Sequence, residues 1–299
     1  MKAILFPGQG SQIVGMGSEF YNNFDNVKDI FKEADEKLKF KISDLILKGP
    51  ETSLRLTENT QPAILTVSYA IYQILIKEFN FDIKNIKYFA GHSLGEYSAL
   101  LCAESLKFTD ALFLLHERGK AMQKAVPVGQ GLMLAILGLN MDEIKNYISK
   151  IEIEKVCEIA NDNADGQIIV SGNINAINNL QKNLKINKKK SIPLPVSAPF
   201  HCSLMKDAAT KMKEKINPIN FKKLNNEIIS NVTASSEKDP EKIKKLLVDQ
   251  IYTKVRWRES ILYMSKNGIS EFIEIGPGKV LSGLVKRIIK ESKVNSINS

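Results

Sequence analysis

The sequence predicts an α/β fold with a large, discontinuous domain and a small, inserted one. Two observations lead to this prediction. Short β-prone apolar runs alternate with helical patterns along the chain, and glycine- and proline-rich loops separate residues 126–196 from the rest. We expect residues 1–125 and 197–299 to form the large domain and residues 126–196 the small one. A chain of 299 residues with 43% hydrophobic content can bury a sizeable core.

The elements of the large domain follow from apolar patterns and from the residues that end them. The first strand is expected at residues 2–6, directly before a glycine-rich loop. Further strands are expected at residues 86–90, 227–231 and 271–275, and helices at residues 61–79, 94–103, 109–125, 201–215, 240–251, 257–266 and 279–289.

The small domain is expected to follow the order βαββαβ, which is the ferredoxin-like unit. Asp165-Gly166 between its two middle strands is typical of a hairpin turn. Clefts are common at domain junctions, so a site is expected where the two domains meet. The predicted strands are residues 132–139, 156–161, 167–172 and 191–196, and the predicted helices are residues 141–151 and 174–184.

The composition argues against several classes of protein. Cys102, Cys157 and Cys202 form no close pair, which indicates neither a disulfide framework nor a cysteine-based metal site and fits a cytoplasmic location. The N-terminal apolar run is too short for a signal peptide. Residues 59–76 contain Pro62 and several polar side chains, so a buried helix is favoured over a membrane span.

The formal net charge is +9 and comes from widely spread lysines. Lys188-Lys189-Lys190 is the only tight run, and it lacks interleaved aromatic residues or a nucleic-acid-binding motif. Nucleic acid is therefore not an expected partner. A diffuse positive field would speed encounter with an acidic partner protein or a phosphorylated cofactor.

The most informative stretch is Gly91-His92-Ser93-Leu94-Gly95, where a strand pattern changes into a helix pattern. A sharp strand-to-helix elbow strains its central residue and exposes that residue's hydroxyl, as in α/β-hydrolases, so the large domain is expected to be α/β-hydrolase-like. The following helix directs its N–H groups toward the place where an oxyanion would form. Ser93 is therefore the candidate nucleophile of an acyl transfer.

A serine nucleophile needs a base, usually a histidine, and the chain has three. His201 follows a proline-rich bend at residues 195–200, at the predicted domain junction, which suits a base that is presented to the serine. His92 lies within the elbow itself, where its side chain would diverge from the hydroxyl, so an orienting or packing role is favoured. His116 lies on a predicted helix and is interpreted as structural. We therefore predict His201 as the base.

Two polar residues interrupt apolar stripes on predicted helices. Arg118 shares a face with Leu115 and Met122, so its guanidinium would point inward and need an anion from either the protein or a substrate. Gln250 shares a face with Leu247, and its ordinary interpretation is a buried glutamine bonded to the backbone. The pattern alone leaves these alternatives open.

The glycine-rich loop at residues 7–12 does not have the pattern of a nucleotide-binding loop. It lacks the lysine of a phosphate-binding loop, and Ile13 stands where a dinucleotide-binding loop would have its third glycine. Its glycines could instead let the backbone approach a reacting centre and offer a second N–H to an oxyanion.

Taken together, these motifs closely resemble the malonyl-CoA:acyl-carrier-protein transacylases of bacterial-type fatty acid synthesis. The resemblance covers nearly the whole chain and rests on several spaced motifs. They are Pro7-Gly8-Gln9-Gly10-Ser11-Gln12, Gly91-His92-Ser93-Leu94-Gly95-Glu96, Arg118-Gly119-Lys120-Ala121-Met122-Gln123, Asn161-Asp162-Asn163, His201-Cys202 with Leu204-Met205, Gln250, and Gly276-Pro277-Gly278-Lys279-Val280-Leu281.

The resemblance implies roles for the candidate residues. Ser93 and His201 would form a catalytic dyad, and the backbone carbonyl of Gln250 would orient the imidazole in place of an aspartate. The backbone N–H groups of Gln9 and Leu94 would form the oxyanion hole. His92 would support the elbow.

It also implies a substrate and a partner. Arg118 would bind the free carboxylate of malonyl, which would pass from malonyl-CoA to the serine and then to the phosphopantetheine thiol of an acidic acyl carrier protein. No metal or other cofactor is implied, because the coenzyme A thioester is the substrate. Phe200 agrees with malonyl selection in related domains. Thr253-Lys254 stand where family members frequently have Asn-Pro, a departure that affects the local loop.

Two other functions stay open at the level of sequence. A serine esterase or thioesterase would need a triad acid between Ser93 and His201, for which Asp162 and Asp165 are the candidates. A non-catalytic module that binds acyl-CoA or a carrier protein would need no reactive serine.

Overall fold

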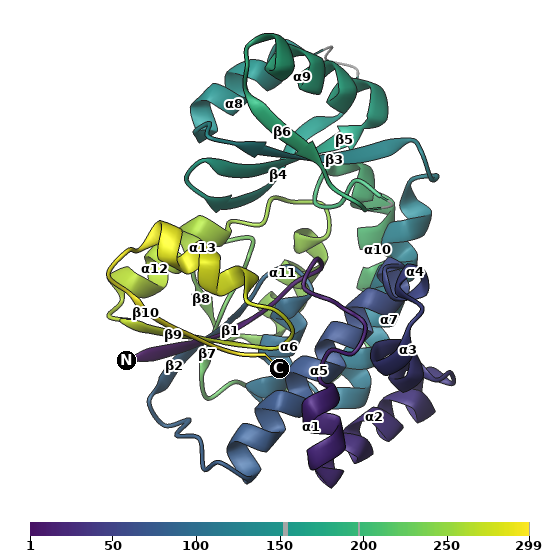
Figure 1. Cartoon of the computed structure of the whole chain (residues 1–299), viewed down its shortest axis with the longest axis vertical. Helices are drawn as coiled ribbons and strands as arrows, with labels where there is room; N and C mark the ends of the chain where they lie inside the picture. The colour runs from purple at the N-terminus through teal and green to yellow at the C-terminus, as the bar shows by residue number, and fades with distance from the viewer. Residues whose placement is uncertain (152–154, 197, 299) are drawn as a thin grey trace.

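The computed structural model describes residues 1–151, 155–196 and 198–298 of the chain. The predicted domain boundary at residue 197, inside the proline-rich bend, lies outside the described residues. The fold is mixed α/β, as predicted, with a central sheet that has helices on both faces (Figure 1).

The central sheet, called the large sheet below, has the order β10-β9-β1-β2-β7-β8. Its neighbours pair in parallel, apart from the antiparallel pair of β7 and β8. The short strand β8 and the strand β10 at the other end of the sheet were not predicted, since β8 has two residues and β10 mixes polar and apolar ones. The strands are β1 (Lys2–Phe6), β2 (Ile86–Gly91), β7 (Glu227–Ile229), β8 (Ser236–Glu237), β9 (Glu271–Ile275) and β10 (Lys293–Ile297).

Side chains of the central strands alternate between two cores. In β1, Ile4 and Phe6 point into one core, whereas Ala3 and Leu5 point into the other. Both faces are covered, so these strands are apolar throughout, as parallel strands usually are. The first core is formed with α1 (Ser18–Asn23), α2 (Asp25–Leu38), α3 (Ile42–Lys48), α4 (Glu51–Leu54), α5 (Thr57–Lys77), α6 (Gly95–Cys102), α7 (Phe108–Ala125), α10 (Lys206–Ile216) and α11 (Pro240–Gln250), and the second with α12 (Trp257–Lys266) and α13 (Val280–Ile288).

The helix predicted at residues 201–215 is divided in the structure. A 3₁₀ turn at Ser203–Met205 precedes α10, and His201 lies before both with a φ of 56°. A positive φ is incompatible with a right-handed helix, so the histidine stands outside the helix that follows it.

A second, antiparallel sheet has the order β4-β5-β3-β6 and is called the small sheet below. Its elements follow one another as β3 (Gly131–Leu137), α8 (Met141–Ile148), β4 (Cys157–Ala164), β5 (Gln167–Asn173), α9 (Ile174–Ile186) and β6 (Lys190–Pro193). The helices α8 and α9 cover the face turned away from the large sheet (Figure 1). Leu134 and Ile136 of β3 pack under them, while Met133 and Ala135 join the first core of the large sheet.

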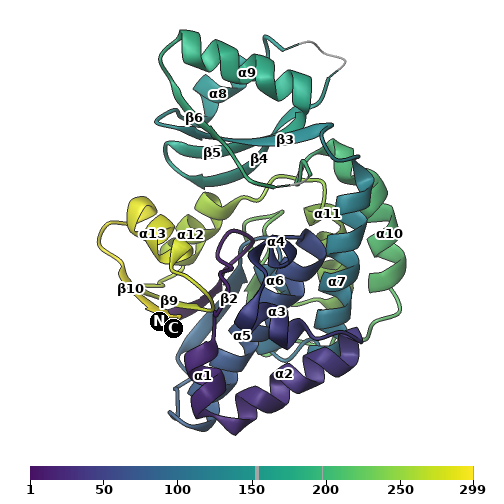
Figure 2. The same ribbon diagram turned by 45° about the vertical axis from the view of Figure 1, so that its right-hand side comes forward.

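The small sheet lies beyond the end of the large sheet from which the loop after β1 emerges (Figure 2). The elbow that follows β2 is at the same end, so residues from both sheets can meet there. In the described part of the chain, no helix has the length and apolar character needed to cross a membrane.

Candidate active site

Ser93 occupies the turn between the end of β2 and the start of α6, with a φ of 54°. A Cβ on Gly91 would lie 1.9 Å from the carbonyl oxygen of Gly95, and one on Gly95 would lie 2.3 Å from the carbonyl oxygen of Phe6. Glycine is therefore required on both sides of the serine. The strained turn is held by the backbone N–H of Ser93, which donates to Oδ1 of Asn231 at 2.7 Å.

His201 contacts the serine, as predicted from the sequence. Its Nε2 lies 2.8 Å from Oγ of Ser93, and its Nδ1 lies 2.8 Å from the backbone carbonyl oxygen of Gln250. A carbonyl can only accept, so Nδ1 carries the proton and Nε2 is left to accept from the serine hydroxyl. Burial and the Arg118 guanidinium lower the pKa of His201 to about 3, which keeps the imidazole neutral near pH 7 and leaves the lone pair of Nε2 free to accept a proton.

Arg118 of α7 is 1% exposed and reaches the same hydroxyl. Its Nη2 donates to Oγ of Ser93 at 3.1 Å and to Oε1 of Gln250 at 2.9 Å, and its Nη1 donates to Oε1 of Gln61 at 2.7 Å. All three acceptors are neutral, and no ion pair joins Arg118 to a carboxylate within the described chain. The sequence left open whether the anion for this arginine comes from the protein or from a substrate. The structure offers no carboxylate of the protein that pairs directly with it.

Ser93, His201 and Arg118 line one cavity of about 380 Å³ between the two sheets. The small sheet contributes Met133 and Asn161 to its wall. Further lining residues are Gln9, Gly10, Gln12, Ile13, Glu51, Arg55, Gln61, His92, Leu94, Met122, Leu194, Pro195, Val196 and Phe200. The cavity thus brings Gln9 and Leu94 together with Ser93 and His201.

The loop after β1 packs closely against the elbow. A Cβ on Gly8 would lie 2.6 Å from the carbonyl oxygen of His92. The side chain of the next residue, Gln9, accepts from Oγ1 of Thr57 at 2.7 Å. Among the hydrogen bonds of the described residues, none uses the backbone N–H of Gln9 or Leu94, so both donors are available to a ligand.

The other two histidines have packing roles. Nε2 of His92 lies 2.8 Å from Oδ1 of Asn163 in β4, and its ring packs edge-on against Trp257. Burial lowers the pKa of His92. His116 pairs through Nδ1 with the backbone carbonyl of Glu58 at 2.9 Å, away from the serine.

Three further polar residues of the site were missed in the sequence. Glu96 accepts from the backbone N–H of Asn231 at 3.1 Å and from Nε2 of Gln250 at 2.8 Å, and burial raises its pKa to about 7. Asn231 holds the serine backbone, and Gln61 holds Arg118. Gln61 and Asn231 lie among other polar residues, and Glu96 is a helix-favouring residue in the first turn of α6, so the signal that singled out Arg118 is absent for them.

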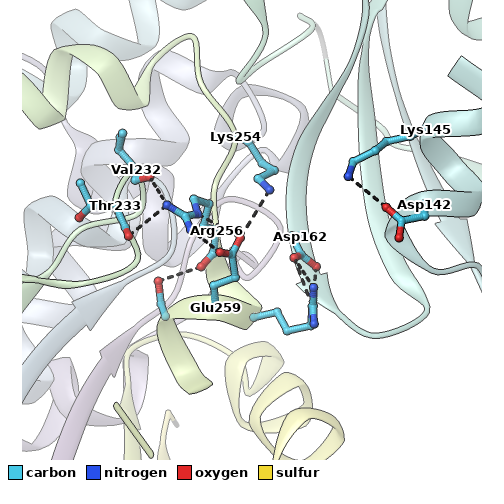
Figure 3. A network of polar contacts seen from close by, with 10 residues as sticks. Asp142, Lys145, Asp162, Val232, Thr233, Lys254, Arg256 and Glu259 are labelled. Carbon is cyan, nitrogen blue, oxygen red and sulfur yellow. Dashed lines mark hydrogen bonds and ion pairs between the residues drawn. The ribbon is translucent and has the colours of Figure 1, made fainter. Parts of the chain in front are cut away.

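A polar cluster joins β4 of the small sheet to α12 and to the segment before it (Figure 3). Asp162, which is 1% exposed, accepts from both Nε and Nη2 of Arg258 at 3.0 Å. Its backbone N–H donates to the carbonyl of Val255 at 2.9 Å, and the N–H of Val255 donates to Ala160 at 2.8 Å. Asp162 is therefore engaged by Arg258, and not by His201 as a triad acid would be.

The loop that departs from the family pattern is held by its own residues. Oγ1 of Thr253 donates to the carbonyl of Asp249 at 2.7 Å, at the end of α11. Lys254 pairs with Glu259 at 3.5 Å (Figure 3). With this loop, the Gln250 carbonyl contacts His201. Within the described residues, no group of three or more His, Cys, Asp or Glu residues could hold a metal ion.

Comparison with known proteins agrees with this geometry. The family model of the acyl transferase domain matches residues 4–298. The chain belongs to the acyl transferase domain family. Among curated members, the malonyl CoA-acyl carrier protein transacylase of Bacillus subtilis (strain 168) is 44% identical over 298 residues, a match that covers 99% of this chain and 93% of the relative.

Solved acyl transferases have the same fold. The acyl-carrier-protein-S-malonyltransferase of Bartonella henselae matches with a TM-score of 0.96 and 42% identity, covering 100% of this chain and 95% of that one. A malonyl-transacylase in complex with its type II PKS acyl-carrier protein matches with a TM-score of 0.96 and 37% identity, covering 100% and 96%.

Proposed function

We propose that this acyl transferase moves malonyl from malonyl-CoA to the phosphopantetheine thiol of an acyl carrier protein and so supplies fatty acid synthesis. The observation that carries the proposal is the guanidinium of Arg118, 3.1 Å from the serine hydroxyl that His201 also contacts. A buried cation beside a nucleophile suits an acyl group that carries a carboxylate. The names of the relatives, malonyl CoA-acyl carrier protein transacylase and malonyl-transacylase, support the same donor and acceptor.

In the first half-reaction, Oγ of Ser93 attacks the thioester carbonyl and its proton passes to Nε2 of His201. The tetrahedral oxyanion is received by the backbone N–H groups of Gln9 and Leu94. The C–S bond then breaks, and the coenzyme A sulfur leaves with the proton from His201. The product is a malonyl ester on Ser93.

The second half-reaction runs the same steps with a different thiol. The phosphopantetheine thiol gives its proton to His201 and attacks the ester carbonyl. When the C–O bond breaks, Oγ of Ser93 regains the proton and malonyl leaves on the carrier protein. The carbonyl of Gln250 keeps the imidazole in the required tautomer throughout.

Arg118 is the proposed determinant of malonyl selection. A bound malonyl carboxylate gives the guanidinium a charged partner in a buried site, whereas acetyl leaves it with neutral acceptors only. Burial also lowers the pKa of Arg118, so the free enzyme gains from an anion here. His92 is the proposed support of the elbow, through Asn163.

The finer description of the fold belongs to the same proposal. We interpret residues 1–125 and 197–299 as an α/β-hydrolase-like large domain, supported by the parallel sheet and the strand-to-helix elbow. We interpret residues 126–196 as a ferredoxin-like small domain, supported by its βαββαβ element order. A cytoplasmic location and the lack of a metal or other cofactor stay predictions; the three buried cysteines form no disulfide, which is consistent with the former.

An exchange assay tests the function. Purified enzyme is supplied with malonyl-, acetyl- or methylmalonyl-CoA and holo acyl carrier protein, and acylated carrier protein is measured. We expect rapid transfer of malonyl, slow release of malonate when the thiol is omitted, and a loss of transfer in Ser93→Ala. Fast release of malonate without a thiol would indicate an esterase or thioesterase, and undiminished transfer in Ser93→Ala would contradict the dyad.

A further inference from the structure

Glu96 is a buried carboxylate beside the reacting serine that the steps above do not use. It lies in the first turn of α6, three residues after Ser93, and is 1% exposed. Its Oε2 accepts from Nε2 of Gln250 at 2.8 Å and from the backbone N–H of Asn231 at 3.1 Å. Burying a carboxylate is costly even when it is hydrogen-bonded, so its place in the site calls for a physical reason.

The nitrogen of the Gln250 side-chain amide faces hydrogen-bond acceptors, and its oxygen faces a donor. Nε2 donates to Oε2 of Glu96 and to the backbone carbonyl of Ser93, at 2.8 and 3.0 Å. Oε1 accepts from Nη2 of Arg118 at 2.9 Å. Oδ1 of Asn231 lies 3.5 Å from the same Nε2. If the amide turned over, its oxygen would face three acceptors and its NH₂ group would face the guanidinium. The acceptors around Nε2, among them the carboxyl oxygen of Glu96, therefore determine that oxygen faces the arginine.

The contact continues from Arg118 to the nucleophile. The Nη2 atom that donates to Gln250 also donates to Oγ of Ser93, at 3.1 Å. A change in the Gln250 amide thus acts on the same nitrogen that faces the acyl group. When Glu96 is ionised, its hydrogen bond from Nε2 is charge-assisted and stronger than a neutral one, so it holds the amide firmly.

We propose that Glu96 is a positioning residue for malonyl selection, which acts through the Gln250 side chain to hold Arg118 toward the acyl group on Ser93. The inference rests on the proposed function, because it takes the malonyl carboxylate as the ligand of Arg118. Loss of the Glu96 acceptor disturbs the arginine. The malonyl donor, which needs the arginine, is affected more than the acetyl donor, which has no carboxylate.

The test compares kcat/KM for malonyl-CoA and acetyl-CoA, with holo acyl carrier protein, in wild type, Glu96→Leu and Glu96→Gln. Leucine removes the acceptor, so we expect malonyl transfer to fall about 10- to 100-fold and the malonyl-to-acetyl ratio to fall about fivefold or more. Glutamine can place an amide oxygen where Oε2 lies and keep both hydrogen bonds. We expect it to retain the wild-type ratio within about threefold.

Glu274 offers a matched control. It is 0% exposed and its carboxylate accepts from the backbone N–H groups of Leu281 and Ser282 at the start of α13, at 3.1 and 2.7 Å. Neither contact belongs to the candidate active site. Glu274→Gln is therefore expected to keep the wild-type malonyl-to-acetyl ratio, whatever its effect on the stability of the protein. A double-mutant cycle adds a second check: in the Gln250→Leu background, Glu96→Leu should change the ratio little, since its effect passes through the Gln250 side chain.

The wild-type ratio in a Glu96→Leu enzyme that is folded, as judged by its Tm, would overturn the proposal. If the leucine variant does not fold, Glu96→Asp decides: it keeps the charge but withdraws the acceptor by one methylene, so the ratio is expected to fall, and an unchanged ratio overturns the proposal. A wild-type enzyme that transfers no malonyl would instead contradict the proposed function, so the two failures are distinguishable.

Discussion

The guanidinium of Arg118 and the imidazole of His201 meet at one atom, the Oγ of Ser93. Nη2 of Arg118 lies 3.1 Å from this oxygen and Nε2 of His201 lies 2.8 Å from it. The hydroxyl therefore donates to the base while it accepts from a cation. The geometry fits two needs of the proposed reaction at once, since the proposed base must be neutral to take the proton and a malonyl group on the serine needs a cation within reach.

Arg118→Ala is expected to lower kcat/KM for malonyl-CoA by about 10²-fold or more, and to lower acetyl transfer less, because only malonyl brings a carboxylate. The measurement is the exchange assay with both donors. Equal losses for the two donors would mean that the arginine has a structural role only.

The depressed pKa of His201 makes the stability of the protein depend on pH. The folded imidazole has a pKa of about 3, against 6.5 for an ordinary histidine, so between these values the unfolded chain binds a proton that the folded chain does not. The contribution of His201 to the free energy of unfolding is therefore greatest above pH 6.5 and falls as the pH falls toward 3.

Urea unfolding of wild type and His201→Gln at pH 7 and pH 5 measures this effect. Between pH 7 and pH 5, wild type is expected to lose about 1–2 kcal/mol more unfolding free energy than His201→Gln loses. Glu96, whose pKa is raised to about 7, titrates in both proteins and largely cancels in the comparison. A difference that does not change with pH would show that His201 is not shifted.

The elbow can be tested with two helical glycines. Gly95→Ala would place a Cβ 2.3 Å from the carbonyl oxygen of Phe6 and 2.8 Å from that of Pro7, so the loop after β1 would have to move. We expect a loss of about 2–3 kcal/mol in unfolding free energy and a fall in transfer. Gly283 of α13 has no atom within 4 Å of such a Cβ, so Gly283→Ala is expected to stabilise by up to ~1 kcal/mol. Similar effects of the two substitutions would contradict the close contact at the elbow.

The joint between the two sheets can be tested at Asp162. The Asp162 side chain is 1% exposed, and Arg258→Ala removes its cation. Because the arginine itself is about one-third exposed, we expect a loss of unfolding free energy somewhat below that of a fully buried pair, about 2–3 kcal/mol. Lys145→Ala is the matched control, because its pair with Asp142 is exposed on both sides and should contribute less than about 0.5 kcal/mol. Equal Tm shifts in the two variants would mean that the Asp162 pair does not hold the sheets together.

The mixed α/β fold and the contact between Ser93 and His201 could be predicted because each left a signal in a short stretch of sequence. For the elbow this signal is the pair of glycines beside Ser93, although Gly95 is also required by its contact with the carbonyl oxygen of Phe6 in β1. His201 was predicted as the base by excluding the other two histidines. In the structure, His92 pairs with Asn163 and His116 pairs with the backbone carbonyl of Glu58. Arg118 was visible as a cation in an apolar stripe.

The side chains that hold Arg118 could not be predicted, because they come from distant parts of the chain. Gln61 and Gln250, which hold Arg118, lie on α5 and α11, and periodicity shows that a residue is buried without showing what it meets. Glu96 looked like an ordinary helix-favouring residue. The break in the helix at His201 depends on a positive φ that no local pattern indicated.

The most direct test of the account is the mass of the protein after incubation with malonyl-CoA and no thiol acceptor. We predict that wild type gains the mass of one malonyl group, that peptide mapping places it on Ser93, and that addition of holo acyl carrier protein removes it. Ser93→Ala should gain nothing. A wild-type protein that stays unmodified while it transfers malonyl, or a Ser93→Ala protein that is still acylated, would contradict the malonyl-serine intermediate.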